Sequence, residues 1–123
     1  MRYTRFEEPP VWNRAIELAV EVYDLTSRSE FRNRYSLRDQ LERATVSVSN
    51  NVAEGFERGT QELLSFIYIA RGSSGEVRSM LCLLERLKAF ANLKSEISNL
   101  KSKAENISRQ IARLGGCFAE LGY

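Results

Sequence analysis

The sequence predicts an all-α protein, and three observations indicate this class. The only prolines, Pro9 and Pro10, stand near the start, so no proline interrupts a helix anywhere after them. Apolar residues then recur three and four positions apart in four long segments. A content of 43% hydrophobic and 28% charged residues is that of an ordinary folded domain. Because short connections join the four segments, we expect one domain over residues 1–123, built as an antiparallel up-and-down four-helix bundle.

The first helix is expected at about residues 10–27. Pro10 suits the first helical turn, where a missing N–H leaves no helical hydrogen bond unmade. The apolar side chains that follow at helical spacing are Val11, Trp12, Ala15, Ile16, Ala19, Val22 and Tyr23. The periodicity is then lost, which predicts a loop whose Phe31 and Tyr35 fold back against the core.

The second helix is expected at about residues 37–57. Ser36 resembles an N-cap, because its hydroxyl can accept a hydrogen bond from a free backbone N–H of the first turn. Asp39 adds a carboxylate at the positive end of the helix. The apolar seam consists of Leu37, Leu41, Ala44, Val48, Val52 and Phe56. Gly59 then predicts a stop, and Thr60 a new cap.

The third and fourth helices are expected at about residues 61–90 and 94–120, with Asn92 as a left-handed stop between them. The third has one apolar row at Leu63, Ile67, Ala70, Val77, Leu81 and Leu84, and a second at Phe66, Ile69, Met80, Leu83 and Leu87. The fourth repeats strictly through Ile97, Leu100, Ala104, Ile107, Ile111, Leu114, Phe118 and Leu121. This repeat also fits an extended coiled coil, but the broader apolar faces of the other helices favour a bundle.

A polar stripe runs along the predicted second helix beside its apolar seam. Its members, which fall together on a helical wheel, are Gln40, Arg43, Ser47, Asn50, Asn51 and Glu54. Small residues lie on the far side of the stripe, at Val46, Ser49 and Ala53. Two packing surfaces exceed what a single bundle requires of one helix, which predicts a subunit interface; the alternative is an ordinary solvated face.

The third helix carries a carboxylate, Glu76, on the row of Ile69 and Met80, so we expect it at the edge of the buried surface. Arg43 and Arg71 are its candidate cations, and Glu54 could complete the network. The set predicted to fix how helices or subunits meet is Gln40, Arg43, Asn51, Glu54, Arg71 and Glu76.

Gly72 and Gly75 interrupt the same predicted helix, where each costs about 1 kcal/mol relative to alanine. We expect them to allow the close approach of another helix. A phosphate-binding loop is the alternative, but the sequence lacks its lysine and spacing.

The net charge of +2 is too small to indicate nucleic-acid binding, so the distribution of the cations matters more. The candidate nucleic-acid-binding residues are Arg28, Arg32, Arg34 and Arg38 around the first loop, with Lys94, Lys101 and Lys103 on the last helix. Alternatively these are solvated surface charges, and Arg38 pairs with Glu42 one turn away.

The sequence offers few residues suited to catalysis or metal binding. It contains no histidine, and Cys82 and Cys117 have no closely spaced partner, so we expect no metal site, no cofactor and two reduced, packed thiols. Glu54, Glu57 and Glu62 could hold a hard cation but read as surface acids. No nucleophile with a positioned base stands out, so we expect no enzyme. The charged N-terminus and short apolar runs predict a cytoplasmic protein without a membrane span.

Three segments, VWNRAIELAVEVYDLT, YSLRDQLERATVSVSNNVAEG and FIYIARGSSGEVRSML, resemble the bacterial four-helix bundle family also called 23S rRNA intervening-sequence proteins. The resemblance spans nearly the whole chain and is most specific in residues 50–55 and 70–76. The sequence departs from the family pattern in the first loop, where it has Phe31-Arg32 in place of the usual Phe-Pro pair.

This resemblance implies a homopentameric ring, which would account for a second packing surface on the second helix. The family is similar in architecture to the accessory variability determinant of diversity-generating retroelements, which binds a reverse transcriptase and nucleic acid. The implied function is a non-enzymatic accessory protein that binds RNA or DNA and docks such a partner. A structural or protein-interaction module without nucleic-acid affinity is the alternative.

Overall fold

A computed structural model describes residues 3–120 and contains four α-helices. They are α1 (Pro10–Thr26), α2 (Tyr35–Arg58), α3 (Thr60–Arg86) and α4 (Lys94–Glu120). Two short 3₁₀ helices lie in the connections, η1 (Ser29–Phe31) and η2 (Lys88–Leu93). No strand occurs within residues 3–120, so the all-α class is confirmed.

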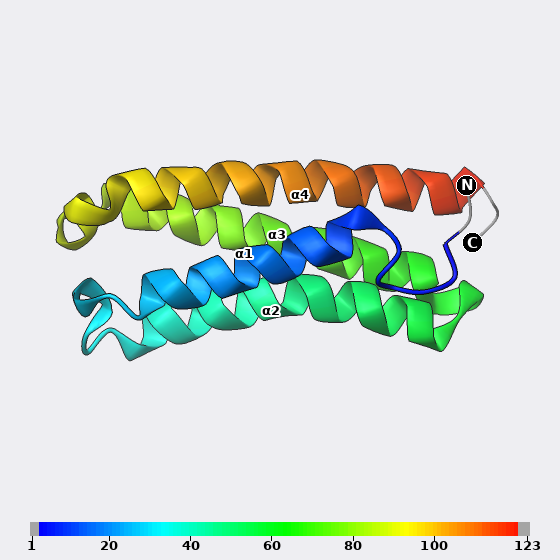
Figure 1. The fold of residues 1–123 in the computed structure, drawn as a ribbon, viewed down its shortest axis with the longest axis horizontal. Coiled ribbons are helices and arrows are strands. Elements are labelled where there is room, and N and C mark those ends of the chain that lie inside the picture. Colours follow the sequence, from blue (N-terminus) through cyan, green and yellow to red (C-terminus); the bar gives the residue numbers. More distant parts are fainter. Residues whose placement is uncertain (1–2, 121–123) are drawn as a thin grey trace.

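The four helices pack side by side as a bundle (Figure 1). Helices α1 and α3 run in one direction along the bundle, and α2 and α4 run in the opposite direction. Around the bundle each helix contacts its neighbours in sequence, and α1 contacts α4 to close the ring of contacts. The contacts are most extensive between α2 and α3 and between α3 and α4, and least extensive between α1 and α4. None of the described helices combines the length and apolarity that crossing a membrane requires.

One continuous core runs along the bundle, and the predicted seams supply most of it. All six residues of the first apolar row of α3 are buried, as are Leu41, Ala44, Val48 and Val52 of α2. In α4 the predicted residues from Ile97 to Phe118 are buried, whereas Leu121 lies outside the described residues. In α1 the core also includes Leu18 and Leu25, which the predicted seam omitted.

Several aromatic and apolar side chains predicted to pack in the core are instead exposed. Tyr23 is 48% exposed and Tyr35 is 60% exposed, whereas Phe31 is buried as expected. In the second apolar row of α3, Met80 is buried but Ile69 and Leu83 are about half exposed. Tyrosine tolerates the surface because its hydroxyl can remain hydrated while the ring covers apolar neighbours.

Two helix boundaries differ from the predicted ones. Helix α2 begins at Tyr35, so Ser36 lies inside the first turn and makes no cap bond. Helix α3 ends at Arg86, because Leu87 adopts an extended conformation and starts the turn into η2. Asn92 lies within η2 and is not left-handed.

The left-handed conformation falls on Asn33, with φ 64°, in the loop before α2. Asparagine is one of the few non-glycine residues that adopt this conformation at low cost. Between α2 and α3, Gly59 has φ 99° and ends α2 as expected. Thr60 is the first residue of α3 and does not serve as its cap.

The glycines of α3 do not serve the purpose expected of them within this chain. A Cβ atom added at Gly72 or Gly75 would meet nothing within 4 Å. The close approach occurs at Gly55 of α2, where an added Cβ would lie 2.9 Å from the Cβ of Phe66. A buried glycine in α2 therefore sets the separation of α2 and α3.

Candidate nucleic-acid interface

The two long connections, residues 27–34 and 87–93, lie at the same end of the bundle, which brings predicted basic residues together (Figure 1). Arg28, Arg32 and Arg34 flank η1, Arg38 lies in the first turn of α2, and Lys94 begins α4. Two contacts tie these segments to each other. The Phe31 and Phe90 ring centroids are 4.7 Å apart, and the Arg28 guanidinium lies 3.1 Å from the Glu96 carboxylate.

Two further cations lie at this end outside the predicted set: Arg86, exposed in the last turn of α3, and Lys88, exposed at the start of η2. Lys88 was not expected in a connection because residues 61–90 were predicted to form one continuous helix. We call the set consisting of Arg28, Arg32, Arg34, Arg38, Lys88 and Lys94 the basic end.

The cations of the basic end differ in how far neighbours offset their charge. Within residues 3–120 no ion pair or hydrogen bond engages the side chains of Arg32, Lys88 or Lys94, and all three are exposed. The Arg34 guanidinium lies over the Phe90 ring, 5.5 Å from its centroid. Such a contact holds the guanidinium in place and leaves its charge uncompensated.

The alternative in which Arg38 pairs with Glu42 is not what the structure shows, because no ion pair joins the two side chains. The Glu42 carboxylate instead accepts a hydrogen bond of 2.6 Å from the Thr26 hydroxyl of α1. Arg38 lies over the Tyr35 ring, 5.4 Å from its centroid. The Arg38 charge therefore also remains available at the basic end.

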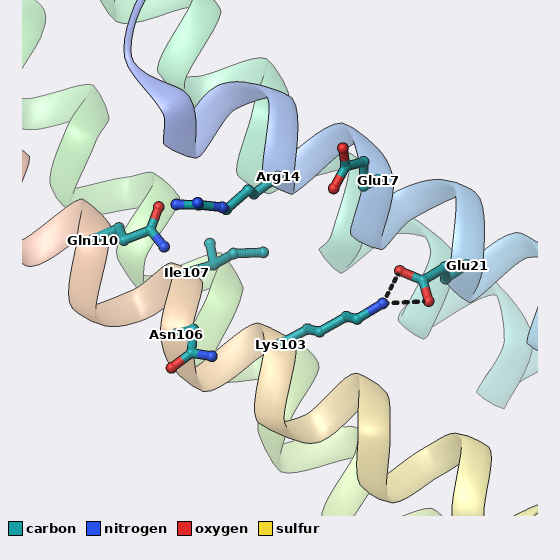
Figure 2. Close-up of a pocket in the computed structure, with 7 residues that line it drawn as sticks. All are labelled: Arg14, Glu17, Glu21, Lys103, Asn106, Ile107 and Gln110. Carbon is teal, nitrogen blue, oxygen red and sulfur yellow. Dashed lines mark hydrogen bonds and ion pairs between the residues drawn. The ribbon is translucent and has the colours of Figure 1, made fainter.

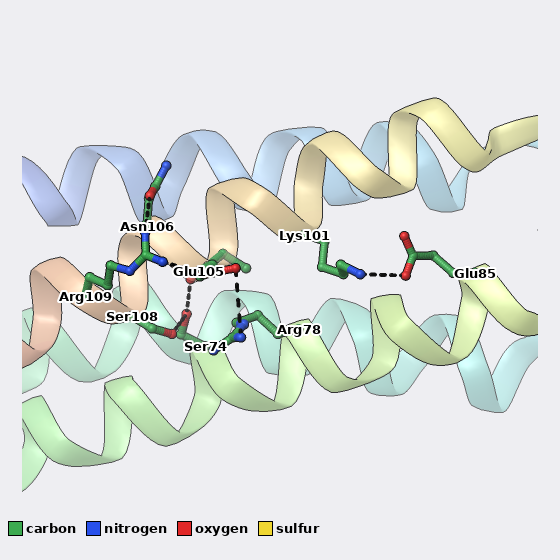
Figure 3. A network of polar contacts seen from close by, with 9 residues as sticks. Ser74, Arg78, Glu85, Lys101, Glu105, Asn106, Ser108 and Arg109 are labelled. Atoms are coloured by element: carbon green, nitrogen blue, oxygen red, sulfur yellow. Dashed lines mark hydrogen bonds and ion pairs between the residues drawn. The ribbon is translucent and has the colours of Figure 1, made fainter.

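Lys101 and Lys103 lie farther along α4 and are held in ion pairs. The Lys101 ammonium is 2.7 Å from the Glu85 carboxylate of α3 (Figure 3). Its hydrogen bond to Glu85 raises the pKa of Lys101 above the ordinary value. The Lys103 ammonium donates at 2.7 Å to both carboxylate oxygens of Glu21 in α1 (Figure 2). The structure thus separates these two lysines from the basic end and offsets their charge.

The pair of Lys103 and Glu21 borders a groove of about 310 Å³ between α1 and α4. Figure 2 shows the side chains of Arg14 and Gln110 extending toward each other across the groove, with Ile107 at its floor. Charges of both signs line this groove, so it is not a concentrated basic surface.

The polar stripe of α2 is only partly joined to another helix. The Ser47 and Ser73 hydroxyls are 2.9 Å apart and link α2 to α3. The Asn51 amide donates to the Ser47 carbonyl at 2.7 Å and to the Ser47 hydroxyl at 2.8 Å. Gln40 and Arg43 remain exposed, and Arg43 borders a groove of about 340 Å³ that also includes Tyr23 of α1.

Helix α2 lies between α1 and α3, and both of its packing surfaces are occupied within one chain. On the side of the small residues, Ser49 is buried, while Val46 and Ala53 are half-buried. The second surface therefore has an explanation that needs no second subunit.

The predicted ion-pair network around Glu76 does not form within residues 3–120. Glu76 is exposed, and no ion pair joins it to Arg43 or Arg71. The Glu54 carboxylate instead lies 3.1 Å from Arg58, which also contacts Glu62 at 3.3 Å. The hydrogen bonds to Glu62 and to Glu54 raise the pKa of Arg58 above its ordinary value. A network between subunits through the same residues stays a prediction.

The described residues contain no group of three or more histidine, cysteine, aspartate or glutamate side chains that could hold a metal ion. Cys82 and Cys117 are free thiols, and each is half-buried.

Together, the fold and this site define a small four-helix-bundle protein with a basic end. A model of the 23S rRNA-intervening sequence protein family matches residues 7–113, and the chain therefore belongs to this family. A comparison with curated proteins finds no match.

Proposed function

We propose that this protein is a non-enzymatic accessory protein of the cytoplasm that holds RNA or DNA at its basic end. One observation supports this most: two connections, about 60 residues apart in sequence, gather six cations at one end of the bundle. Arg32, Lys88 and Lys94 have no anionic partner within residues 3–120. Phosphate groups would supply the missing negative charge.

The proposal includes assembly of the antiparallel bundle into a homopentameric ring. Family membership is the basis for this part, and the bare face of α3 supports it. On that face the apolar side chains of Ile69 and Leu83 are about half exposed. In a five-fold ring each cation of the basic end is present five times, so a chain of net charge +2 can present a strong local field.

Native mass spectrometry tests the ring. The chain has a mass of 14.1 kDa, so five copies should give about 70 kDa. A stable monomer at micromolar concentration would contradict the ring and remove the five-fold repetition of the basic end.

Binding to labelled single-stranded RNA and to DNA of the same sequence, each at two salt concentrations, tests the nucleic-acid function. We expect binding at low ionic strength that weakens as salt rises, because phosphate contacts release condensed counterions. Exchanging Arg32→Gln and Lys94→Gln together removes two unpaired cations and should weaken binding roughly tenfold. The matched control is Arg5→Gln with Arg58→Gln, which removes the same charge elsewhere and should bind as the wild type does.

A second candidate is a protein-interaction module without nucleic-acid affinity. The exposed apolar side chains of Val20 and Tyr23 on α1, and of Tyr68, Ile69 and Leu83 on α3, favour it. This reading prevails if no RNA or DNA binding appears at low salt. Docking of a reverse transcriptase belongs to the first proposal, and a reverse-transcriptase gene beside this one would support it.

A further inference from the structure

A groove of about 380 Å³ runs between α3 and α4 at mid-bundle, apart from the basic end. Four arginines line it: Arg71 and Arg78 from α3, and Arg109 and Arg113 from α4. Arg71 was predicted to belong to the polar network, and the other three arginines were not predicted as site residues. The sequence spacing does indicate that the arginines of each helix share a face, because Arg71 and Arg78 are seven residues apart and Arg109 and Arg113 are four apart.

The α3 side of the groove is open between its two arginines. Gly75 lies between Arg71 and Arg78 on one row of the helix, since the three positions fall within about 60° on a wheel of 100° per residue. A Cβ atom at Gly75 would meet nothing within 4 Å, so the backbone of α3 is accessible there. On the α4 side, the lining residues also include the small side chains of Ser108 and Ala112. A bulky anionic group can therefore come close to the guanidinium groups.

Guanidinium groups from both helices lie close to one carboxylate of the protein, that of Glu105. The Glu105 carboxylate contacts Arg109 of its own helix and lies 4.0 Å from the guanidinium of Arg78 on α3 (Figure 3). Arg71 and Arg113 are exposed, and neither is in an ion pair within the described part of the chain. Four arginines against the single lining carboxylate leave a surplus of three positive charges.

We propose that this arginine groove binds a stretch of nucleic-acid phosphodiester backbone, as a second contact beside the basic end. The inference rests on the proposed function. Two helical turns separate Arg71 from Arg78, about 10 Å along α3, so the two guanidinium groups can contact different phosphate groups of one strand.

The lining of the groove indicates backbone recognition without base recognition. No aromatic ring is among its lining residues, so bases have no surface there on which to stack. The Ser108 hydroxyl already donates to Ser74 at 2.8 Å, which leaves guanidinium groups as the available donors. We therefore expect phosphate groups to be the main contacts of this groove.

The test measures binding of a labelled mixed-sequence RNA over a series of salt concentrations. Exchanging Arg71→Gln and Arg113→Gln together should weaken binding roughly tenfold and reduce the slope of log affinity against log salt by about 1.5. Glu105→Gln should strengthen binding, because it removes the carboxylate that competes with phosphate for Arg78 and Arg109. The double exchange Arg5→Gln with Arg58→Gln controls for net charge, and circular dichroism checks folding.

The outcomes separate this inference from the proposed function. If Arg32→Gln with Lys94→Gln weakens binding while the groove exchanges and Glu105→Gln behave as the charge control does, the arginine groove is overturned and the basic end stands. If the groove exchanges alone weaken binding, the groove is supported and the basic end is not. If the wild type does not bind RNA at low salt, both are overturned.

Discussion

At the scale of single residues, glycine occupies two contrasting positions in the bundle. Gly55 is buried where α2 meets α3, and an added Cβ would lie 2.9 Å from Phe66 and 3.2 Å from Leu63. Gly72 is exposed inside α3 with open space around it. The same exchange to alanine should therefore have opposite effects at the two positions.

Gly55→Ala should destabilise the protein by about 1–3 kcal/mol, because the contacting Cβ of Phe66 cannot move without shifting α3. Gly72→Ala should stabilise it by about 0.5–1 kcal/mol, since alanine loses less backbone entropy in a helix. Urea unfolding followed by circular dichroism measures both. Equal effects of the two exchanges would contradict the close approach at Gly55.

The carboxylate of Glu8 shows how a residue before the first helix is held. The backbone N–H groups of Thr4 and Arg5 each donate to Glu8 at 2.7 Å, and the Thr4 hydroxyl donates at 3.0 Å. These hydrogen bonds, that from the Thr4 backbone first, lower the pKa of Glu8. The charged form is thus favoured in the folded state.

The stability that Glu8 contributes should be fully present above the ordinary glutamate pKa of about 4.3, and it should be lost as pH falls through the lowered folded pKa. Unfolding midpoints of the wild type and Glu8→Gln, measured from neutral to acidic pH, should converge toward low pH. A constant difference between the two proteins at every pH would exclude this origin.

At the scale of helices, a chain of hydroxyl groups joins α3 to α4. The buried Ser74 hydroxyl donates to the Ala104 carbonyl at 2.9 Å, and the Ser108 hydroxyl donates to Ser74 at 2.8 Å (Figure 3). A buried serine in an apolar seam therefore has its donor satisfied by the facing helix.

Ser74→Ala should cost about 1–2 kcal/mol, because the Ser108 hydroxyl loses its acceptor. Ser79→Ala, an exposed exchange on the same helix, should be neutral or slightly stabilising. Thermal unfolding compares them. A cost at Ser74 no larger than that at Ser79 would show that the hydroxyl chain adds nothing to stability.

The contact between Phe31 and Phe90 ties η1 to η2. In a double-mutant cycle with Phe31→Leu and Phe90→Leu, we expect a coupling of about 0.5–1.5 kcal/mol, because the rings contact directly. Phe118, near the opposite end of α4, provides the control, since Phe31→Leu with Phe118→Leu should be additive. If the effects of Phe31→Leu and Phe90→Leu on the free energy of unfolding are additive, the contact between the two rings does not couple η1 to η2.

The helices themselves could be predicted from the sequence because their apolar periodicity is strong, as at Leu41, Val48 and Val52. The boundaries could not, since they depend on backbone conformations at Asn33 and Leu87 that no local pattern specifies. Tyr23 and Tyr35 were misplaced for a related reason. Helical spacing locates a face but does not say how far a neighbouring helix covers it.

At the scale of the whole molecule, the candidate site was predictable only where it lies in the connections. Arg28, Arg32 and Arg34 were recognised as a cluster because they are close in sequence. Lys88 lies beside the first loop only in the folded protein, and the arginine groove is built from residues of α3 and α4. Helix packing alone brings these separate segments together. The ion pairs that hold Lys101 and Lys103 likewise depend on which helices become neighbours.

The groove between α1 and α4 lies where the bundle has its least extensive helix contact (Figure 2). Helix α1 is also the shortest of the four, with 17 residues. Local opening should therefore start along this seam, and the backbone amides of α1 should exchange with deuterium before those of α3. An opened α1 would uncover the buried side chains of Leu18 and Val22, so the seam is where a transient hydrophobic surface would first reach the solvent.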